Sequence, residues 1–490
     1  MKSFERRLSV VGVPRLVRLH RATPHVARAR RTMPPKVSIV ALASALVALV
    51  LKSRLSRRKP SKPTANAIVP RVRATTAETS TTADGTPARS LARTTTSPLR
   101  TREPAIDHTA GGLETVEIRA RGITARVSPF GATLVGVECA RPGREDDDDG
   151  REDITLGYDD CESYDQTEGR PYFGAVCGRV ANRIAKGEFA LGRETFRLKK
   201  NNGENTLHGG ESGWDRKRWT IEDKSRSSVT LRYESTSGEE GFPGKVIVHT
   251  VYSCVGFGER VTVEADDVSG GVKLVVKNYA ELTTKMTATT DATTPISTVQ
   301  HTYFNLHGHA SGRDCSAHVV SMPACDRYVP VDAETLIPTG EGLKNVHGTP
   351  YDLREPTPIF AKSSDGYDNT FVIAGADATR PASELPREPP RLAARVTCPE
   401  ARRALEVYTD APGVHLYTGN FLSGTMLGKI KGGARYARQG GFCLETGWFP
   451  DAVNQHAKIG DAYPSVVVRR GDSYSHTLTY RIENDPSVDE

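Results

Sequence analysis

Short runs in which apolar and polar residues alternate recur along residues 113–485 of this 490-residue chain. Examples are SSVTLRYES (227–235), KVIVHTVYS (245–253), RALEVYTD (403–410) and HTLTYRIE (476–483). Successive side chains of a strand point to opposite faces, so this period of two predicts strands with one buried face. Almost no stretch keeps a helical period for more than two turns. The sequence therefore predicts an all-β fold, a large antiparallel β-sandwich in a domain spanning residues 106–490.

The basic residues of the chain are concentrated before this domain. Residues 1–77 hold 18 Lys and Arg and one acid, Glu5, a net charge of +17. The whole chain carries +7, so the remainder carries +7 less +17, which is −10. A mildly acidic domain presents no obvious surface for phosphates, which argues against nucleic acid as its partner.

Residues 1–105 read as a basic leader that holds one apolar segment, VSIVALASALVALVL (37–51). This run is shorter than the roughly 20 residues of a membrane-spanning helix. It is typical of a signal-peptide core or a weak membrane anchor, which would give membrane association through residues 37–51. The basic residues after it favour a cytosol-facing domain, whereas the acid-poor composition also fits an organelle transit sequence. Residues 52–105 lack apolar periodicity and are predicted to be a disordered linker.

The eight cysteines are scattered, and none forms a CxxC pair. Such spacing is typical of buried free thiols in a reducing compartment, although it does not exclude disulfides. Two charged segments, residues 141–153 and 375–391, are predicted to be surface insertions.

Two segments in the first half of the domain carry candidate site residues. In GRVANRIAKGEF (178–189), Asn182 and Arg183 are neighbours, so a bend or bulge is needed to bring both into one site. An arginine fork suits an oxygen-rich ligand, although a surface arginine is an equally good interpretation of this segment alone. In NTLHGG (205–210), His208 precedes two glycines, which suits either a ligand-facing histidine or a simple turn.

The segment QHTYFNLHGH (300–309) places His301, Tyr303 and Asn305 on one face of a strand. A polar face of this kind is unusual in a core and natural in a strand that lines a polar cleft. His301, His307 and His309 also suggest a metal site. The sequence disfavours it, because no carboxylate lies nearby and HGH is typical of a turn.

Two carboxylates complete the set of candidate residues. Glu445 stands in the apolar run FCLETGWF (442–449), where a carboxylate is costly unless it is hydrogen-bonded or needed. The alternative is an edge-strand glutamate that points to water. Asp368, in DGYDNTF (365–371), fits either a turn or a site. Histidine and a buried glutamate together suit general acid–base work on a polyol near neutral pH.

These segments, in this order, resemble the aldose 1-epimerase (galactose mutarotase) family from about residue 113 to 485. The motifs that carry the resemblance are PYFGAVCGRVANRIAKGEFAL, NNGENTLHGG, HTYFNLHGH, DGYDNTF, PGVHLYTGNFLSG and CLETGWFPDAVN. The resemblance implies a large β-sandwich with a sugar site in an open cleft. It also implies interconversion of α and β anomers by ring opening, with aldohexoses such as galactose and glucose as substrates and no metal or organic cofactor.

The resemblance also implies a role for each candidate residue. Glu445 would be the base at the C1 hydroxyl, and His301 the acid at the ring oxygen. His208 would hydrogen-bond the ring oxygen, with its two glycines leaving room for the sugar. Asn182 and Arg183 would hold substrate oxygens, and Asp368 would accept hydrogen bonds from sugar hydroxyls.

The chain departs from the family pattern at Ala411 and Gly447, where a glutamine is common, and this puts the sugar preference in doubt. A related hexose-6-phosphate 1-epimerase is one alternative, although Asp368 near the site argues against a second anion. A non-catalytic sugar-binding protein should lack the acid or the base, and both are present here. A glycoside hydrolase would need a second convincing carboxylate opposite Glu445.

Overall fold

The computed structural model describes residues 106–484 except 109–113, 145–149, 159, 166–168, 267–270, 376–380, 385–388, 425–426 and 429–432. The predicted leader and linker, residues 1–105 with the apolar run 37–51, lie outside the described residues. No helix in the described part of the chain has the length and apolar character needed to cross a membrane.

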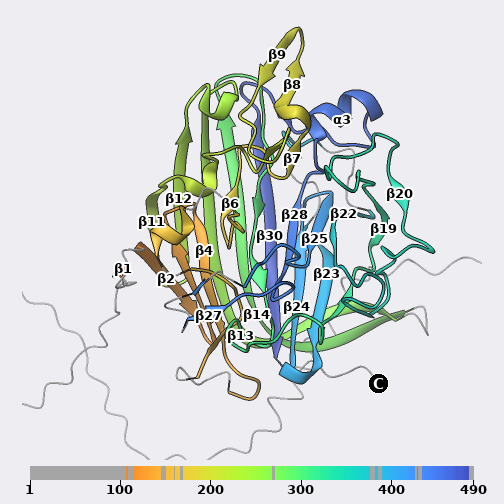
Figure 1. Ribbon diagram of the computed structural model, residues 1–490. Coiled ribbons are helices and arrows are strands. Elements are labelled where there is room, and N and C mark those ends of the chain that lie inside the picture. Colours follow the sequence, from red (N-terminus) through yellow and green to blue (C-terminus); the bar gives the residue numbers. More distant parts are fainter. Residues whose placement is uncertain are drawn as a thin grey trace, which may run out of the picture. The chain divides into compact units, whose positions relative to one another are not determined.

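Three antiparallel sheets build most of the fold (Figure 1). The largest has nine strands in the order β11 (Thr220–Lys224), β12 (Ser228–Ser235), β13 (Val246–Asp266), β14 (Gly271–Thr290), β30 (Ser473–Asn484), β24 (Arg403–Thr409), β23 (Arg391–Cys398), β18 (Val319–Ser321) and β21 (Thr357–Pro358). The second has six strands in the order β17 (Tyr303–Phe304), β28 (Phe442–Gly447), β25 (Gly413–Tyr417), β22 (Asp368–Ile373), β19 (Cys325–Tyr328) and β20 (Lys344–Asn345). The third runs β1 (Ile106–His108), β2 (Glu114–Ala120), β3 (Ile123–Ser128), β4 (Thr133–Cys139) and β5 (Glu152–Asp153).

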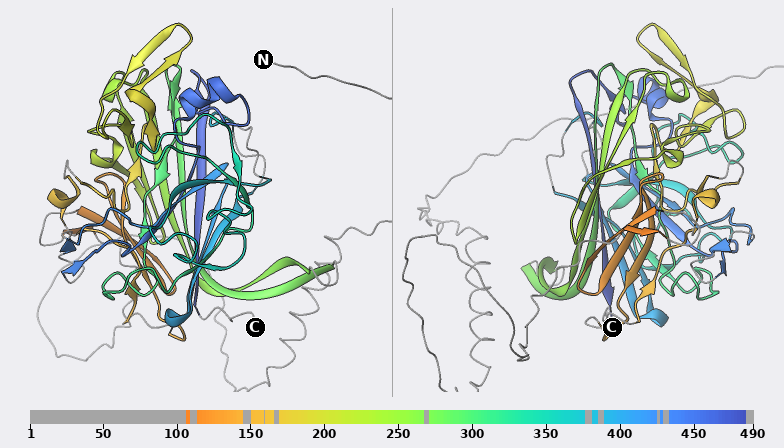
Figure 2. Two further views of the ribbon diagram at one scale, coloured as in Figure 1. Left: turned by 45° about the vertical axis from the view of Figure 1, so that its right-hand side comes forward. Right: turned by 90° about the vertical axis from the view of Figure 1, so that its left-hand side faces the viewer.

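Smaller elements connect these sheets. The two-stranded pairs are β6 (Val176–Cys177) with β16 (Val299–Gln300), β7 (Arg183–Ile184) with β10 (Thr206–Leu207), β8 (Glu188–Leu191) with β9 (Glu194–Arg197), β15 (Thr294–Pro295) with β29 (Val467–Val468), and β26 (Leu427–Gly428) with β27 (Ala434–Arg435). The α-helices among the described residues are α2 (Cys161–Tyr164) and α3 (Ala452–Ile459). Figure 2 shows α3 beside the β8–β9 hairpin and the long β13–β14 hairpin extending beyond the other strands.

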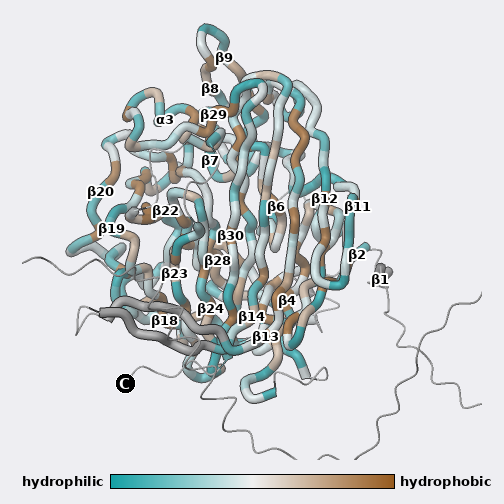
Figure 3. The backbone as a smooth tube through the Cα atoms, turned by 180° about the vertical axis from the view of Figure 1, so that it is seen from behind, coloured by the Kyte–Doolittle hydropathy of each residue, from teal (hydrophilic) through white to brown (hydrophobic). Residues whose placement is uncertain are grey.

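One apolar core joins the six-stranded and the nine-stranded sheet. On β28, Phe442 and Leu444 are fully buried, whereas the alternate residues of the same strand face the opposite side. The Phe304 ring of β17 contacts the Tyr480 ring of β30 at 4.9 Å between centroids. Figure 3 shows hydrophobic and hydrophilic stretches following one another along the strands. The predicted all-β sandwich is confirmed.

The predicted surface insertion at residues 141–153 is wrong for its last residues, because Glu152 and Asp153 form β5. Asp153 is buried, and its carboxylate accepts hydrogen bonds from the Thr155 hydroxyl at 2.8 Å and from Arg126 at 3.1 Å. These partners offset the cost of burying the charge. In the second predicted insertion, 375–391, Ala382 is also fully buried in the core.

The predicted free thiols fit the structure. Seven cysteines are free and buried in the described part of the chain, at positions 139, 177, 254, 315, 325, 398 and 443.

Candidate functional site

A cleft of about 370 Å³ opens over the face of the six-stranded sheet that points away from the core. Its lining includes the six residues to which the sequence analysis gave a role in the site: Asn182, Arg183, His208, His301, Asp368 and Glu445. Further lining comes from Arg170, Tyr172, Asn202, Tyr303, Leu336, His415, Tyr417 and Phe421, among others. The candidate residues are therefore brought together from segments up to 263 positions apart in the numbering, between Asn182 and Glu445.

Strand register explains why the central groups meet. In the β17–β28 pair Tyr303 lies opposite Cys443, and continuing this antiparallel register places His301 opposite Glu445. On the other side of β28, Glu445 pairs directly with His415 of β25, and His415 pairs with Thr370 of β22. Glu445 thus lies on an inner strand, flanked by a histidine on each side. It is 4% exposed, so it is not an edge-strand glutamate pointing to water.

His301 and Glu445 form the closest acid–base pair in the cleft. The Nε2 atom of His301 lies 3.4 Å from Oε1 of Glu445, and its Nδ1 atom lies 3.6 Å from Sγ of Cys443. Burial raises the pKa of the Cys443 thiol well above its usual value, so the sulfur stays protonated. A neutral thiol is both a weak donor and a weak acceptor. It can therefore pair with His301 whether or not Nδ1 carries a proton.

His208 is held as a neutral hydrogen-bond donor. The backbone N–H of Asn182 donates to its Nδ1 at 3.3 Å, which leaves the proton of the neutral ring on Nε2. Burial, and then the positive charge of His301, lowers the pKa of His208 well below its usual value. Its ring lies 5.2 Å from the His301 ring and 4.6 Å from the Tyr172 ring, between centroids.

The backbone around the cleft is strained at four lining residues, one of which is Leu336 with a φ of 54°. Tyr172, Asn182 and His208 have φ values of 59°, 59° and 50°, in the left-handed region that non-glycine residues rarely adopt. Asn182 and His208 hold each other in this conformation, because the His208 N–H also donates to the Asn182 carbonyl at 3.1 Å. The bend at Asn182 is what allows both Asn182 and Arg183 to line the cleft, as the sequence analysis required.

The expectation that the two glycines after His208 make room for a sugar is wrong. Neither Gly209 nor Gly210 lines the cleft. Their φ values are +88° and +110°, and a Cβ on Gly209 would lie 1.9 Å from the carbonyl oxygen of Gly178. A Cβ on Gly210 would lie 2.4 Å from a carboxylate oxygen of Glu240. The glycines are needed for close packing of the protein against itself.

Polar partners fix the remaining candidate residues. Nε of Arg183 donates to Oδ1 of Asn202 at 3.1 Å, which orients the guanidinium along the cleft wall. Oδ1 of Asn182 accepts from the Arg183 N–H at 2.8 Å.

Asp368 is bound by His415, a residue that the sequence analysis missed. Nε2 of His415 lies 2.8 Å from Oδ1 of Asp368, and Nδ1 lies 2.8 Å from the Thr370 hydroxyl. Burial opposes both charges, but the hydrogen bond and the mutual attraction outweigh it. The pKa of Asp368 is therefore lowered and that of His415 is raised. The pairing of β22 with β25 creates this contact, and the sequence gives no sign of that pairing.

A second missed group stands at the cleft wall. Nε of Arg170 lies 3.3 Å from Oδ2 of Asp215, and both side chains are almost fully buried. The Arg170 guanidinium also lies over the Tyr172 ring, 4.7 Å from its centroid. Burial raises the pKa of Asp215 to about 6, against the lowering effect of Arg170. The pair thus orients the aromatic ring that contacts both catalytic-candidate histidines.

Asn305, His307 and His309 of the 300–309 segment do not line the cleft. The side-chain amide of Asn305 donates to the carbonyls of Arg313 and Gly440 at 2.8 and 3.0 Å, so its role is structural. His309 contacts the Tyr436 hydroxyl at 3.1 Å, and His307 contacts Cys398. His301, His307 and His309 do not form a common ligand set among the described residues.

The two departures from the family pattern lie outside the main cleft. Ala411 is fully buried in the apolar core. Gly447 borders a cavity of about 10 Å³ next to Glu445 and His415, where a Cβ would meet a Val299 methyl at 3.0 Å. Neither residue lines the main cleft.

Comparison with known proteins identifies close relatives. The family model described as aldose 1-epimerase matches residues 114–270 and 267–481. Galactose mutarotase from Bos taurus is 38% identical over 377 residues, which cover 76% of this chain and 94% of the relative. The galactose mutarotase of Homo sapiens is 38% identical over 376 residues, with the same coverage of both chains. Aldose 1-epimerase from Escherichia coli K12 is 32% identical over 368 residues, 74% of this chain and 92% of the relative.

Solved structures share the fold. An aldose epimerase homologue from C. elegans superposes with a TM-score of 0.59 at 23% identity, covering 76% of this chain and 99% of that chain. A galactose 1-epimerase from Lactobacillus acidophilus gives a TM-score of 0.56 at 23% identity, covering 78% of this chain and 98% of that chain. With the family model matched across most of the described residues and relatives above 30% identity over nearly their full length, this chain belongs to the aldose 1-epimerase family.

Proposed function

We propose that this chain is an aldose 1-epimerase that interconverts the α and β anomers of aldohexoses such as galactose and glucose. The observation that carries the proposal is the His301–Glu445 pair, with Nε2 and Oε1 3.4 Å apart at the floor of the cleft. Ring opening of a hemiacetal needs a base at the C1 hydroxyl and an acid at the ring oxygen. Because both oxygens are bonded to C1, the two groups must lie close together.

Ring opening begins with Glu445 and His301. The Glu445 carboxylate takes the proton of the C1 hydroxyl, the C1 oxygen becomes a carbonyl, and the bond from C1 to the ring oxygen breaks. The His301 imidazolium gives its Nε2 proton to the departing ring oxygen. Cys443 pairs with Nδ1 in either protonation state of the ring, which supports an acid that loses and regains its proton.

Ring closure reverses these steps on the other face of the carbonyl. After rotation about the C1–C2 bond, neutral His301 takes back the proton of the hydroxyl as its oxygen attacks C1. Glu445 returns its proton to the carbonyl oxygen, so both groups end in their starting states. The protein needs no net proton and no redox partner for this cycle.

His208 assists at the ring oxygen. Its Nε2–H is fixed by the Asn182 N–H at Nδ1, and its lowered pKa keeps the ring neutral near pH 7. A neutral donor stabilises the negative charge that develops on the ring oxygen without taking the proton that His301 supplies.

The other lining residues hold the substrate. Arg183 and Asn182 offer donors to sugar oxygens, and the guanidinium is oriented in advance by Asn202. Asp368 accepts from sugar hydroxyls with the oxygen that His415 leaves available. Fixed partners of this kind reduce the entropy lost when the sugar is ordered.

Polarimetry tests the proposal. Freshly dissolved α-D-galactose and α-D-glucose are followed to their equilibrium rotation with and without the full-length protein, and glucose 6-phosphate is run in parallel. The proposal predicts acceleration with the free sugars and a lower kcat/KM with the phosphate. A preference for the phosphate would favour the hexose-6-phosphate epimerase. Sugar binding by calorimetry without acceleration would favour a binding protein.

A further inference from the structure

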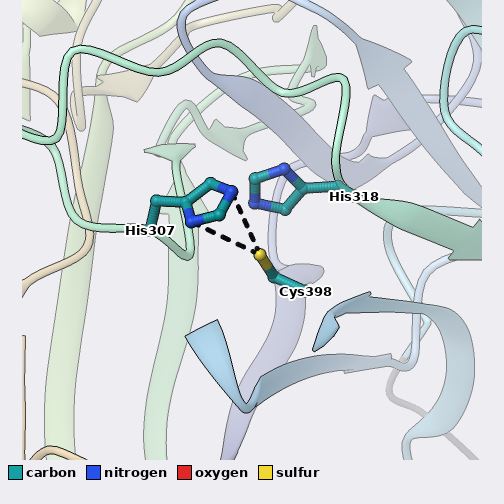
Figure 4. Close-up of side chains that lie close together, drawn as sticks. All are labelled: His307, His318 and Cys398. Atoms are coloured by element: carbon teal, nitrogen blue, oxygen red, sulfur yellow. Dashed lines mark hydrogen bonds between the residues drawn. The ribbon is translucent and has the colours of Figure 1, made fainter. Parts of the chain in front are cut away.

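A second cluster of metal-ligating side chains lies apart from the sugar cleft and shares no residue with it. His307 follows β17, His318 immediately precedes β18, and Cys398 ends β23. Figure 4 shows the three side chains close together, with dashed lines joining both ring nitrogens of His307 to the sulfur of Cys398. The histidine that the sequence raised as a metal ligand thus has partners that its own segment does not contain.

The spacing of the donor atoms suits a small tetrahedral cation. Nε2 of His307 lies 3.4 Å from Sγ of Cys398, and the rings of His307 and His318 stand nearly perpendicular. One donor atom from each of the three residues lies within 4.8 Å of the others. Bond lengths of about 2.0–2.1 Å to nitrogen and about 2.3 Å to sulfur around tetrahedral zinc place N and S roughly 3.5 Å apart. The His307–Cys398 distance already matches this value.

His318 is held in the tautomer that a metal ligand needs. Its Nδ1 lies 3.2 Å from the Cys315 carbonyl, which can only accept, so Nδ1 carries the proton. Donation to a backbone carbonyl is the usual second contact of a zinc-binding histidine. The lone pair is then on Nε2, where the Leu306 N–H now donates at 3.0 Å. Metal binding would exchange this one neutral hydrogen bond for a metal–nitrogen bond.

The cluster has an entrance and a source of a fourth ligand. His307 lines a second cleft of about 310 Å³, together with Glu152 and Glu400. Glu400 lies two residues from Cys398 and pairs with Arg313, and Glu152 pairs with Arg403 at 2.6 Å. A water or a carboxylate oxygen from this cleft could complete four-coordination.

We propose that His307, His318 and Cys398 bind one Zn²⁺ ion, with the fourth position open to the second cleft. The ion would cross-link three segments: the turn after β17, the turn before β18 and the end of β23. Because β17 begins two residues after His301, the ion would stabilise the strands that position His301 and Glu445 without touching the sugar. The proposal does not depend on the proposed function.

The test uses Co²⁺ as a spectroscopic probe in the full-length protein after removal of metals with a chelator. A bound Co²⁺–thiolate pair gives an intense charge-transfer band that imidazole and carboxylate ligands do not give. The proposal predicts one equivalent of Co²⁺ with this band, displaced by one equivalent of Zn²⁺. Absence of the band, or of the displacement, would overturn it.

Variants assign the site. His307→Ala, at a half-buried side chain, should weaken binding at least about tenfold, and Cys398→Ser should remove the band. The control is Cys443→Ser, because Cys443 lies beside the other candidate ligand set of His208, His301 and Glu445. The band should survive in Cys443→Ser and in saturating galactose. A band that persists in Cys398→Ser would place the metal elsewhere and refute the proposal. A band that is lost in Cys443→Ser or in saturating galactose would do the same.

Discussion

The substitution His208→Asn distinguishes the roles of the two ring nitrogens of His208. The shorter asparagine amide can place its oxygen near the position of Nδ1, where it accepts from the Asn182 N–H, but nothing reaches the position of Nε2. Asparagine also tolerates the φ of 50° at this position better than most residues. The variant should therefore fold while lacking the donor at the sugar ring oxygen.

The expected loss follows from the role of one fixed donor. Removal of such a donor at a developing oxyanion costs about 10²–10³ in kcat, or ~2.7–4 kcal/mol of transition-state stabilisation. The ring contacts with Tyr172 and His301 are also lost, and each aromatic pair is worth about 0.5–1.5 kcal/mol of folding free energy. We thus expect a large fall in kcat, a small change in KM and a modest drop in the thermal midpoint.

The matched variant is His208→Gln, whose longer amide can reach the Nε2 position and donate there while losing the Nδ1 acceptor. Polarimetry with α-D-galactose gives kcat and KM, and thermal denaturation gives stability for both variants. A donor role for Nε2–H predicts a higher kcat for His208→Gln than for His208→Asn. Equal losses in the two, or an Asn variant within about threefold of the wild-type kcat, would show that Nε2–H does not act in the transition state.

Two further predictions concern stability. Gly209→Ala should lower the free energy of unfolding by about 2–5 kcal/mol in urea denaturation, because the new Cβ meets the Gly178 carbonyl at 1.9 Å at a φ of +88°. Gly203→Ala, with φ +57° and open space, is the control and should cost only about 1 kcal/mol; equal costs would refute the packing role. His415→Gln should destabilise the protein most below about pH 6.5, where the raised pKa of His415 gives its full stabilisation, and this cost should shrink as the pH rises through the folded-state pKa. Unfolding free energies measured at about pH 6 and about pH 9 check this, and a difference between variant and wild type that is the same at both values would contradict it.

Local patterns in the sequence predict what depends on strand periodicity. His301 and Tyr303 are two positions apart, which predicts that they share one face of a strand. Both side chains line the cleft. Glu445 stands out in the sequence as a carboxylate in an apolar run. Its strand, β28, is a buried inner strand, which explains both the apolar neighbours and the burial of the carboxylate. These features are local because alternation belongs to the single strand.

Features that depend on register and backbone conformation could not be predicted. His415 meets Asp368 only through the β22–β25 pairing, and Arg170 meets Asp215 across 45 residues of chain. The left-handed backbone at His208 is imposed by its hydrogen bonds with Asn182 rather than by residue type. The misread role of Gly209 has the same origin, because its neighbour Gly178 comes from a distant segment.

The central claim is that Glu445 is the base that opens the sugar ring. Its most direct test is Glu445→Gln in the full-length protein, a nearly isosteric change that keeps an oxygen or an amide nitrogen near Nε2 of His301. Polarimetry with α-D-galactose should show kcat reduced by about 10²–10⁴, while calorimetry shows galactose binding retained. A Glu445→Gln protein that reaches the equilibrium rotation at the wild-type rate would remove Glu445 from the mechanism.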